Sequence, residues 1–190
     1  MESAAETNRQ LANLIRFGTV AAVDLGRALC RVQTGEMLSD FVPWFVPRAG
    51  AAIEWSAPSV GEQGVLLSAG GDTHGAVFLR GIYSDAFPAP SNSGAAHLAR
   101  YKDGALIEYD DTAHTLRATL PAGATAEITA DGGVTVNGPL TVNGNVQVNG
   151  DLGISGNATA EVDVVGGGKS LKSHKHLQVT AGTAVSGPPQ

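Results

Sequence analysis

The chain has 190 residues, of which 43% are hydrophobic and 16% charged, so it has enough apolar material to fold rather than stay disordered. Its formal net charge is -6, and an acidic chain is a poor match for a phosphate backbone, so we expect no nucleic-acid partner. The single cysteine, Cys30, excludes an intrachain disulfide, and no apolar run approaches the ~18 residues of a membrane-spanning helix. The acidic amino terminus does not predict a secretory signal, so we expect synthesis in a cytoplasm.

Residues 1–16 are expected to form a short helical arm. Leu11, Leu14 and Ile15 recur at i, i+3 and i+4, a narrow apolar stripe on an otherwise polar segment. Residues 17–86 change to short β-like runs that are separated by proline and glycine turns, and both tryptophans lie there. Five or six such strands predict a small antiparallel barrel with its own core. The expected strands are 17–23, 28–32, 41–46, 52–55, 64–68 and 76–83.

Residues 87–96 have the composition of a linker, and a repetitive rod is expected over residues 97–165. The repeat has a period of six, with aliphatic residues at the first and third places and, in most copies, glycine at the fifth. Because side chains two apart on a strand share a face, each repeat is a short strand with two aliphatics on one side, followed by a tight bend. The clear copies are Val134–Gly138, Leu140–Gly144, Val146–Gly150 and Leu152–Gly156, with weaker ones at Ala158–Ala160 and Val162–Val164.

Two architectures can bury these aliphatic pairs. A single-chain left-handed β-helix needs three hexapeptides for each coil, so the repeats here would make about two coils, short of the three or more stacked units that bury a continuous core. No aromatic residue follows Leu116, and a lone ribbon of this composition would expose both its apolar face and its strand edges. Three copies wrapped around one axis would cover both, so the sequence favours an intertwined homotrimer.

The segment 166–190 is expected to be the apex of that trimer. His174 and His176 are two apart and would point the same way on an extended chain, so three copies would bring six imidazoles to the axis. Six nitrogen ligands suit an octahedral first-row metal such as iron, with nickel and zinc as competing metals. A site without an open position would be structural and would hold three chain ends together. The alternative is that both histidines are solvated.

No catalytic constellation is predicted. The run Gly168-Lys169-Ser170 lacks the upstream glycine of a phosphate-binding loop. The run Asp110-Asp-Thr-Ala-His114 is expected to be a solvated turn between two strands, and Cys30 a small core residue. His74 and His97 are expected to lie in loops.

The order of parts resembles the family of baseplate assembly protein V, the central spike of contractile-tailed phages. The resemblance covers nearly the whole chain, and the tailocins, which are phage-tail-like bacteriocins, use a similar spike that the sequence does not separate from a phage one. The segments that carry it are Trp55-Ser-Ala-Pro58-Ser-Val-Gly61-Glu62-Gln63-Gly, Tyr101-Lys-Asp-Gly104-Ala-Leu-Ile-Glu-Tyr109-Asp, and His174-x-His176-x-x-Val179-x-x-Gly182 followed by Ser186-Gly187-x-Pro189.

This resemblance implies an all-β fold in which a short helix and an oligonucleotide/oligosaccharide-binding (OB) barrel precede a triple-stranded β-helix with a metal-pinned tip. It implies one iron ion per trimer, held on the three-fold axis by His174 and His176. It also implies that the barrel docks onto the tail hub and other baseplate proteins. On sheath contraction the spike would then pierce the bacterial outer membrane from the tail tip of a virion or tailocin, after assembly in the host cytoplasm.

Two other functions compete with a structural spike. A trimeric hexapeptide-repeat acyltransferase with His174 or His176 as base would need a complete single-chain coil and a cofactor groove, and the repeat is short for both. A carbohydrate-binding tail fibre would carry exposed aromatic residues in its distal part, where this chain has none. We therefore expect a structural protein and not an enzyme.

Overall fold

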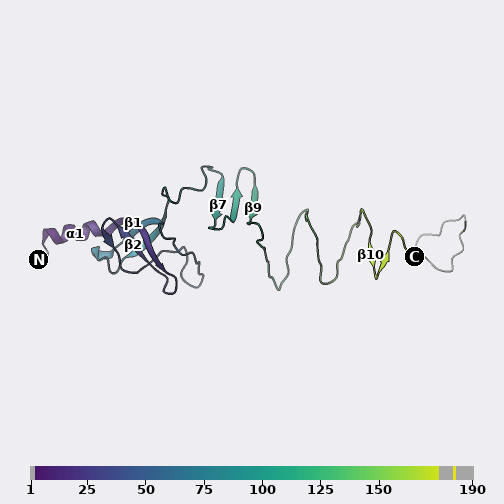
Figure 1. The fold of residues 1–190 in the computed structure, drawn as a ribbon, viewed down its shortest axis with the longest axis horizontal. Helices are drawn as coiled ribbons and strands as arrows, with labels where there is room; N and C mark the ends of the chain where they lie inside the picture. The colour runs from purple at the N-terminus through teal and green to yellow at the C-terminus, as the bar shows by residue number, and fades with distance from the viewer. Residues whose placement is uncertain (1–2, 176–181, 183–190) are drawn as a thin grey trace. The chain divides into compact units, whose positions relative to one another are not determined.

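A computed structural model of the chain describes residues 3–175 and Gly182 and divides into two compact units, Met1–Glu127 and Ile128–Gln190. Apart from one short helix, a single 3-10 turn and connecting loops, the regular structure of the described residues is β (Figure 1). None of the helices among these residues has the length and apolar character needed to cross a membrane. The all-β class expected from the sequence is confirmed, and the two units are described separately below.

The chain begins with helix α1 (Ala4–Leu14). Ser3 caps it, because its hydroxyl accepts a hydrogen bond from the backbone N–H of Glu6 at 3.2 Å. The helix ends where Ile15 adopts an extended conformation and starts the first strand. The carbonyl of Leu14 then accepts a hydrogen bond from the N–H of Ser68 at 2.9 Å, so the arm is fastened to the barrel at its last turn.

Six strands form the barrel that follows. They are β1 (Ile15–Asp24), β2 (Leu29–Thr34), β3 (Met37–Leu38), β4 (Val42–Pro43), β5 (Gln63–Leu67) and β6 (Val77–Ile82), with a 3-10 turn η1 (Ala69–Gly71) between the last two. The sheet runs in the order β3-β2-β1-β5-β6, and β4 pairs with β2. Trp44, just after β4, bridges to Phe78 of β6, and the Phe45 N–H donates to the Phe78 carbonyl at 2.9 Å. This contact joins the two ends of the sheet and closes the barrel.

The barrel buries its own core. Phe78, Leu66, Val32 and Cys30 have no exposed surface, and Trp44 is 8% exposed. The cross-strand pair Gly18 and Gly64 lets the strands approach closely, because a Cβ on Gly64 would lie 2.6 Å from the ring of Phe78. The expected core position of Cys30 is confirmed, and its burial raises the pKa of the thiol to about 11.

Two expected strands of the barrel are wrong in extent. Residues 41–46 yield only the two-residue strand β4, since Pro43 and Pro47 cannot donate to a ladder. Residues 52–55 form no strand; a single bridge joins Ala49 and Ile53. The loop is held instead by Trp55, whose ring lies 5.6 Å from that of Trp44.

A three-stranded antiparallel meander follows, made of β7 (Ala96–Arg100), β8 (Leu106–Asp110) and β9 (Thr115–Thr119) (Figure 1). The described residues between β6 and β7 contain neither helix nor strand, in keeping with the composition of a linker. His97 lies on β7 and not in a loop, which corrects the expectation for that residue. The acidic run after β8 is the exposed turn that was expected, since the Asp110 side chain accepts hydrogen bonds from the N–H groups of Thr112 at 3.0 Å and Ala113 at 2.8 Å.

The second unit is dominated by the repeat. Bends recur at residues 138, 143–144, 149–150, 155–156 and 161–162, which confirms the six-residue period. Between the bends the chain forms no helix or strand, and the described residues 120–164 pair with no strand of the same chain. Figure 1 shows this part as a path that swings repeatedly from side to side. The unit ends in the small hairpin of β10 (Val165–Gly166) and β11 (Lys169–Ser170).

Candidate functional site: the aliphatic repeat and the tip

The aliphatic side chains of the repeat are exposed in the single chain. Every described residue from 122 to 162 is exposed, aliphatic and polar residues alike. At least 49% of the surface of each paired aliphatic side chain is open, which is far above the 0–8% of the barrel core. The pairs are Val134 and Val136, Leu140 and Val142, Val146 and Val148, Leu152 and Ile154, and Val162 and Val164.

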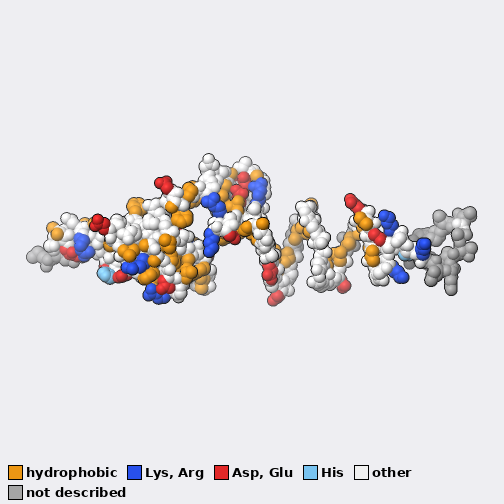
Figure 2. All heavy atoms as spheres, viewed as in Figure 1, with side chains coloured by type: hydrophobic (Ala, Val, Ile, Leu, Met, Phe, Trp, Pro, Cys, Tyr) orange, Lys and Arg blue, Asp and Glu red, His pale blue; other side chains and the backbone are white. Residues whose placement is uncertain are grey.

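These exposed aliphatic residues differ from ordinary surface aliphatics because they recur in pairs every six residues. Side chains at the first and third places share one side of each extended segment, while the residue between them faces the opposite side. In Figure 2 the apolar side chains recur along this part of the chain between polar surfaces. A continuous apolar strip next to extended backbone without strand partners is a surface that other chains cover, through side-chain packing and through strand pairing.

The tip begins with a tight hairpin after the last repeat. Val165 pairs with Ser170, and Gly166 with Lys169, so the loop consists of two residues, Gly167 and Gly168. Both have positive φ, 55° and 76°, which is the geometry of a type I′ turn. The run Gly168-Lys169-Ser170, which superficially resembled a phosphate-binding loop, is therefore the end of a hairpin turn followed by strand β11.

His174 follows this hairpin and is held by its backbone. The His174 N–H donates to the carbonyl of Ser170 at 3.0 Å. Its Nδ1 lies 3.0 Å from the same oxygen and 3.1 Å from the carbonyl of Leu171. Carbonyl oxygens only accept, so the ring proton belongs on Nδ1 and the lone pair on Nε2. A metal-binding histidine usually donates its other ring N–H to a backbone carbonyl or a carboxylate, which fixes the orientation of the ring.

The second expected ligand, His176, lies outside the described residues. Within residues 3–175 and Gly182 of one chain, no group of three or more His, Cys, Asp and Glu side chains lies close enough to hold a metal ion. The structure thus describes one histidine of the expected pair, with a ring orientation that suits a ligand.

The barrel carries a second apolar surface, which the sequence reasoning missed. We call it the barrel face. Ile15 and Phe17 of β1 are each 67% exposed, and their side chains alternate with those that point into the core. The strand register places them in two rows across β1, β5 and β6. The rows are Ile15, Leu67 and Val77, and Phe17, Val65 and Leu79. Aliphatic residues at successive positions of β5, on both sides of the strand, are the sequence signal that could have predicted it.

The remaining titratable clusters of the described chain are exposed. His74 lies 3.1 Å from Asp72 and 3.7 Å from Asp40, but its side chain is 81% exposed. His114 is in the exposed turn between β8 and β9 with φ of 51°. These groups are arranged as solvated turns and lack the enclosure of a catalytic centre.

Comparison with known proteins relates two regions of the chain to described families and most of its length to a curated protein. Residues 16–83 match the family described as the type VI secretion system/phage-baseplate injector OB domain. Residues 97–160 match the family described as the Gp138 β-helical trimerization domain. Over 127 residues the chain is 45% identical to the spike protein of Escherichia phage P2, an alignment that covers 67% of this chain and 59% of that protein. The chain thus aligns with about three fifths of the length of this relative.

Proposed function

We propose that the chain belongs to the family of phage baseplate spike proteins and is the central spike of a contractile tail or tailocin, built as a homotrimer. The observation that carries this proposal is the strip of aliphatic pairs, each at least 49% exposed in the single chain. A trimer would turn the strips of three chains toward one axis and pair their strand edges.

The burial would stabilise the trimer strongly. Removing apolar surface from water contributes about 25 cal/mol per Å², and the strip has five aliphatic pairs in each of three chains. Interlocked chains also have to separate together, so unfolding one chain requires breaking contacts with the other two. A shaft of this kind is suited to transmitting force along its axis.

The proposed role is structural and not enzymatic. The match to spike and trimerization families favours it over the hexapeptide-repeat acyltransferase, which would need a coil closed within one chain. The segments that join the bends of residues 138–162 instead form no strand pair with any described residue of their own chain.

We assign the barrel face to docking on the tail hub and other baseplate proteins. Its six apolar residues lie on the sheet surface opposite the core, where a soluble monomer would normally carry polar side chains. Its strands belong to the barrel domain, whose matched family is the baseplate injector OB domain. The tip would meet the bacterial outer membrane transiently, and the trimer would assemble in the host cytoplasm before it joins the virion.

The tip is proposed to hold one iron ion per trimer through His174 and His176. The fit of His174 rests on its Nδ1, which faces two backbone carbonyls and so leaves the ligand lone pair on Nε2. The ion would supply a structural crosslink between three chain ends.

The assembly proposal is tested by purifying tail particles from the producing bacterium. Quantitative mass spectrometry is expected to find three copies of the chain per particle, and labelling with an antibody against the apex is expected to mark the baseplate end. Particles without the chain, or with label spread along the tube, would contradict the proposal.

The metal proposal has a separate test. Replacement of His174 and His176 by alanine together should abolish the iron that elemental analysis finds in the purified protein, while the nearby Lys172→Ala should leave it unchanged. Equal iron in the wild type and the double variant would overturn the assignment.

A further inference from the structure

We propose that Asp163 is the positioning residue of the tip: its carboxylate closes the hairpin β10–β11 and thereby holds the turn that carries His174. The chain of contacts begins at the last aliphatic pair of the repeat, where Asp163 stands between Val162 and Val164. It ends eleven residues later at the imidazole.

The carboxylate of Asp163 joins the two ends of the hairpin. Its Oδ1 accepts hydrogen bonds from the N–H of Val164 at 2.8 Å and from the N–H of Lys172 at 3.1 Å. Next to it, the N–H of Leu171 donates to the carbonyl of Val164 at 2.8 Å. One side chain therefore ties the residue that enters the hairpin to the residue that leaves it.

Ser170 extends the connection toward the histidine. A hydrogen bond from the Ser170 hydroxyl, together with backbone N–H groups of Lys172, Val164 and Leu171, lowers the pKa of Asp163 below its ordinary value. The same hydroxyl accepts a hydrogen bond from the N–H of Ser173 at 2.9 Å, and the two serine hydroxyls lie 2.9 Å apart. Asp163 and Ser170 are both half-buried in a region where nearly every other residue is exposed.

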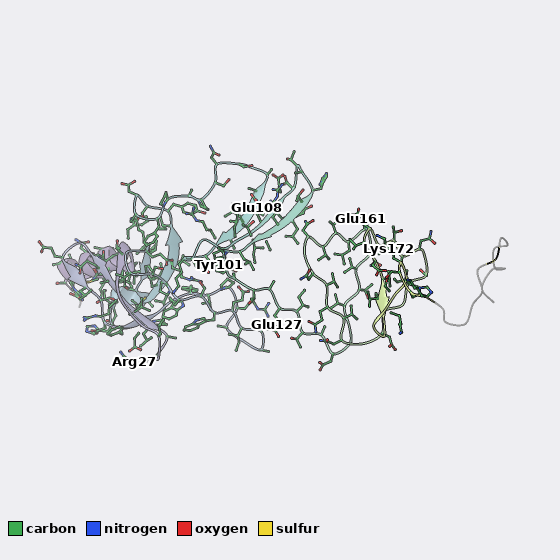
Figure 3. The ribbon with its side chains drawn as sticks, turned by 45° about the vertical axis from the view of Figure 1, so that its right-hand side comes forward. Arg27, Tyr101, Glu108, Glu127, Glu161 and Lys172 are labelled. Carbon is green, nitrogen blue, oxygen red and sulfur yellow. The ribbon has the colours of Figure 1, made fainter. Side chains whose placement is uncertain are left out.

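The turn held in this way contains the contacts of His174. The Ser170 carbonyl accepts from the His174 N–H at 3.0 Å and faces its Nδ1 at 3.0 Å. Lys172, which donates to Asp163, lies within this turn, and Figure 3 labels it beside the hairpin. Without the carboxylate, the hairpin retains a two-residue ladder, the backbone hydrogen bond from Leu171 to Val164 and a glycine-rich loop. A two-stranded ladder of that length is marginal in water, so the orientation of His174 depends on Asp163.

The identity of the residue can be explained by its chemistry. A carboxylate offers two acceptor oxygens and no donor, which suits a position that faces a hydroxyl and several N–H groups. Asparagine would keep one acceptor oxygen and would direct an NH₂ group at donors. Alanine would remove the connection altogether.

The test compares amide hydrogen exchange of wild-type protein, Asp163→Ala and Asp163→Asn, each after treatment with a chelator. Asp151→Asn, at an exposed aspartate of the repeat, is the matched control. We expect the amides of Leu171, Lys172 and His174 to exchange at least tenfold faster in Asp163→Ala, with a smaller increase in Asp163→Asn and none in Asp151→Asn. Unchanged exchange in Asp163→Ala would overturn the proposal.

A second measurement uses iron-loaded protein and follows loss of iron to excess chelator. We expect Asp163→Ala to lose iron at least tenfold faster than Asp151→Asn. If the two variants lose iron at equal rates although amide exchange is faster in Asp163→Ala, the hairpin does not position the ligand. That result would overturn the positioning role. This arm rests on the proposed iron site. If wild-type protein contains no iron, the proposed iron site is refuted. The exchange rate of the His174 amide would then be the sole test of the role of Asp163.

Discussion

The barrel and the repeat both contain many aliphatic side chains, but the barrel buries them within one chain and the repeat exposes them. In the barrel, six strands close on themselves and leave Phe78 and Leu66 with no exposed surface. In the repeat, Leu140 and Leu152 are 72% and 71% exposed within one chain. The difference teaches that apolar side chains can be buried within one chain or between chains. The barrel buries its side chains by closing its own sheet, whereas the repeat needs copies of the same chain.

The most severe way to break this comparison is to place a charge on the apolar strip. In Leu140→Asp, three carboxylates would meet at the trimer axis, where each buried charge costs several kcal/mol. We expect complete loss of the trimer at micromolar concentration, measured by size-exclusion chromatography with light scattering. Thr141→Asp is the control, because the same charge on the neighbouring residue would face solvent. Trimers of Leu140→Asp would contradict the assignment of the strip.

Removal of a core side chain from the barrel should lower the stability of the barrel and leave the trimer intact. Phe78→Ala removes a fully buried ring, which costs about 3–5 kcal/mol. Chemical denaturation followed by tryptophan fluorescence reports on the barrel, since both tryptophans lie there. The trimer should persist, and Leu25→Ala, at a position that is 62% exposed, should change stability by less than about 0.5 kcal/mol. Dissociation of the trimer by Phe78→Ala would contradict the claim that the barrel core and the trimer contacts of the repeat are stabilised independently.

A smaller change tests how tightly the barrel is packed. In Gly64→Ala the added methyl would meet the Phe78 ring at 2.6 Å and the carbonyl of Leu79, so we expect a loss of about 1–3 kcal/mol in the same denaturation assay. Gly75 has nothing within 4 Å of its potential Cβ, and Gly75→Ala should be close to neutral. Equal stability of the two variants would mean that the strands can separate to admit a methyl group.

The mildest test uses the single thiol. Burial raises the pKa of Cys30 to about 11, so the folded barrel retains the thiol proton over a range in which the unfolded chain releases it. Stability should therefore fall as the pH rises from about 9 toward 11. At pH 8 we expect iodoacetamide to label native protein at least tenfold more slowly than protein in denaturant. Equal labelling rates would show that the barrel core is open to reagent.

The sequence predicts the repeat better than the barrel. The six-residue period is visible in the residues themselves, and the bends of the structure recur with the same period. The loop of Trp55 was misread as a strand because its apolar residues match a strand pattern, whereas ring packing against Trp44 holds it. The barrel face was missed because the outward direction of Phe17 follows from its cross-strand register with β5, and the successive aliphatic residues of β5 were not used as a signal. At the tip, the histidine pattern was visible in sequence, but the contacts of Asp163 require the folded hairpin.

The central claim is that the repeat is covered by copies of the same chain, and native mass spectrometry of the untagged protein tests it most directly. We predict one species near 58 kDa, three times the chain mass of 19.3 kDa, that persists on dilution to nanomolar concentration. Added mass of one iron atom on that species would support the proposed tip site as well. A monomer of 19.3 kDa as the main species would contradict the account, because the aliphatic strip would then remain exposed to water.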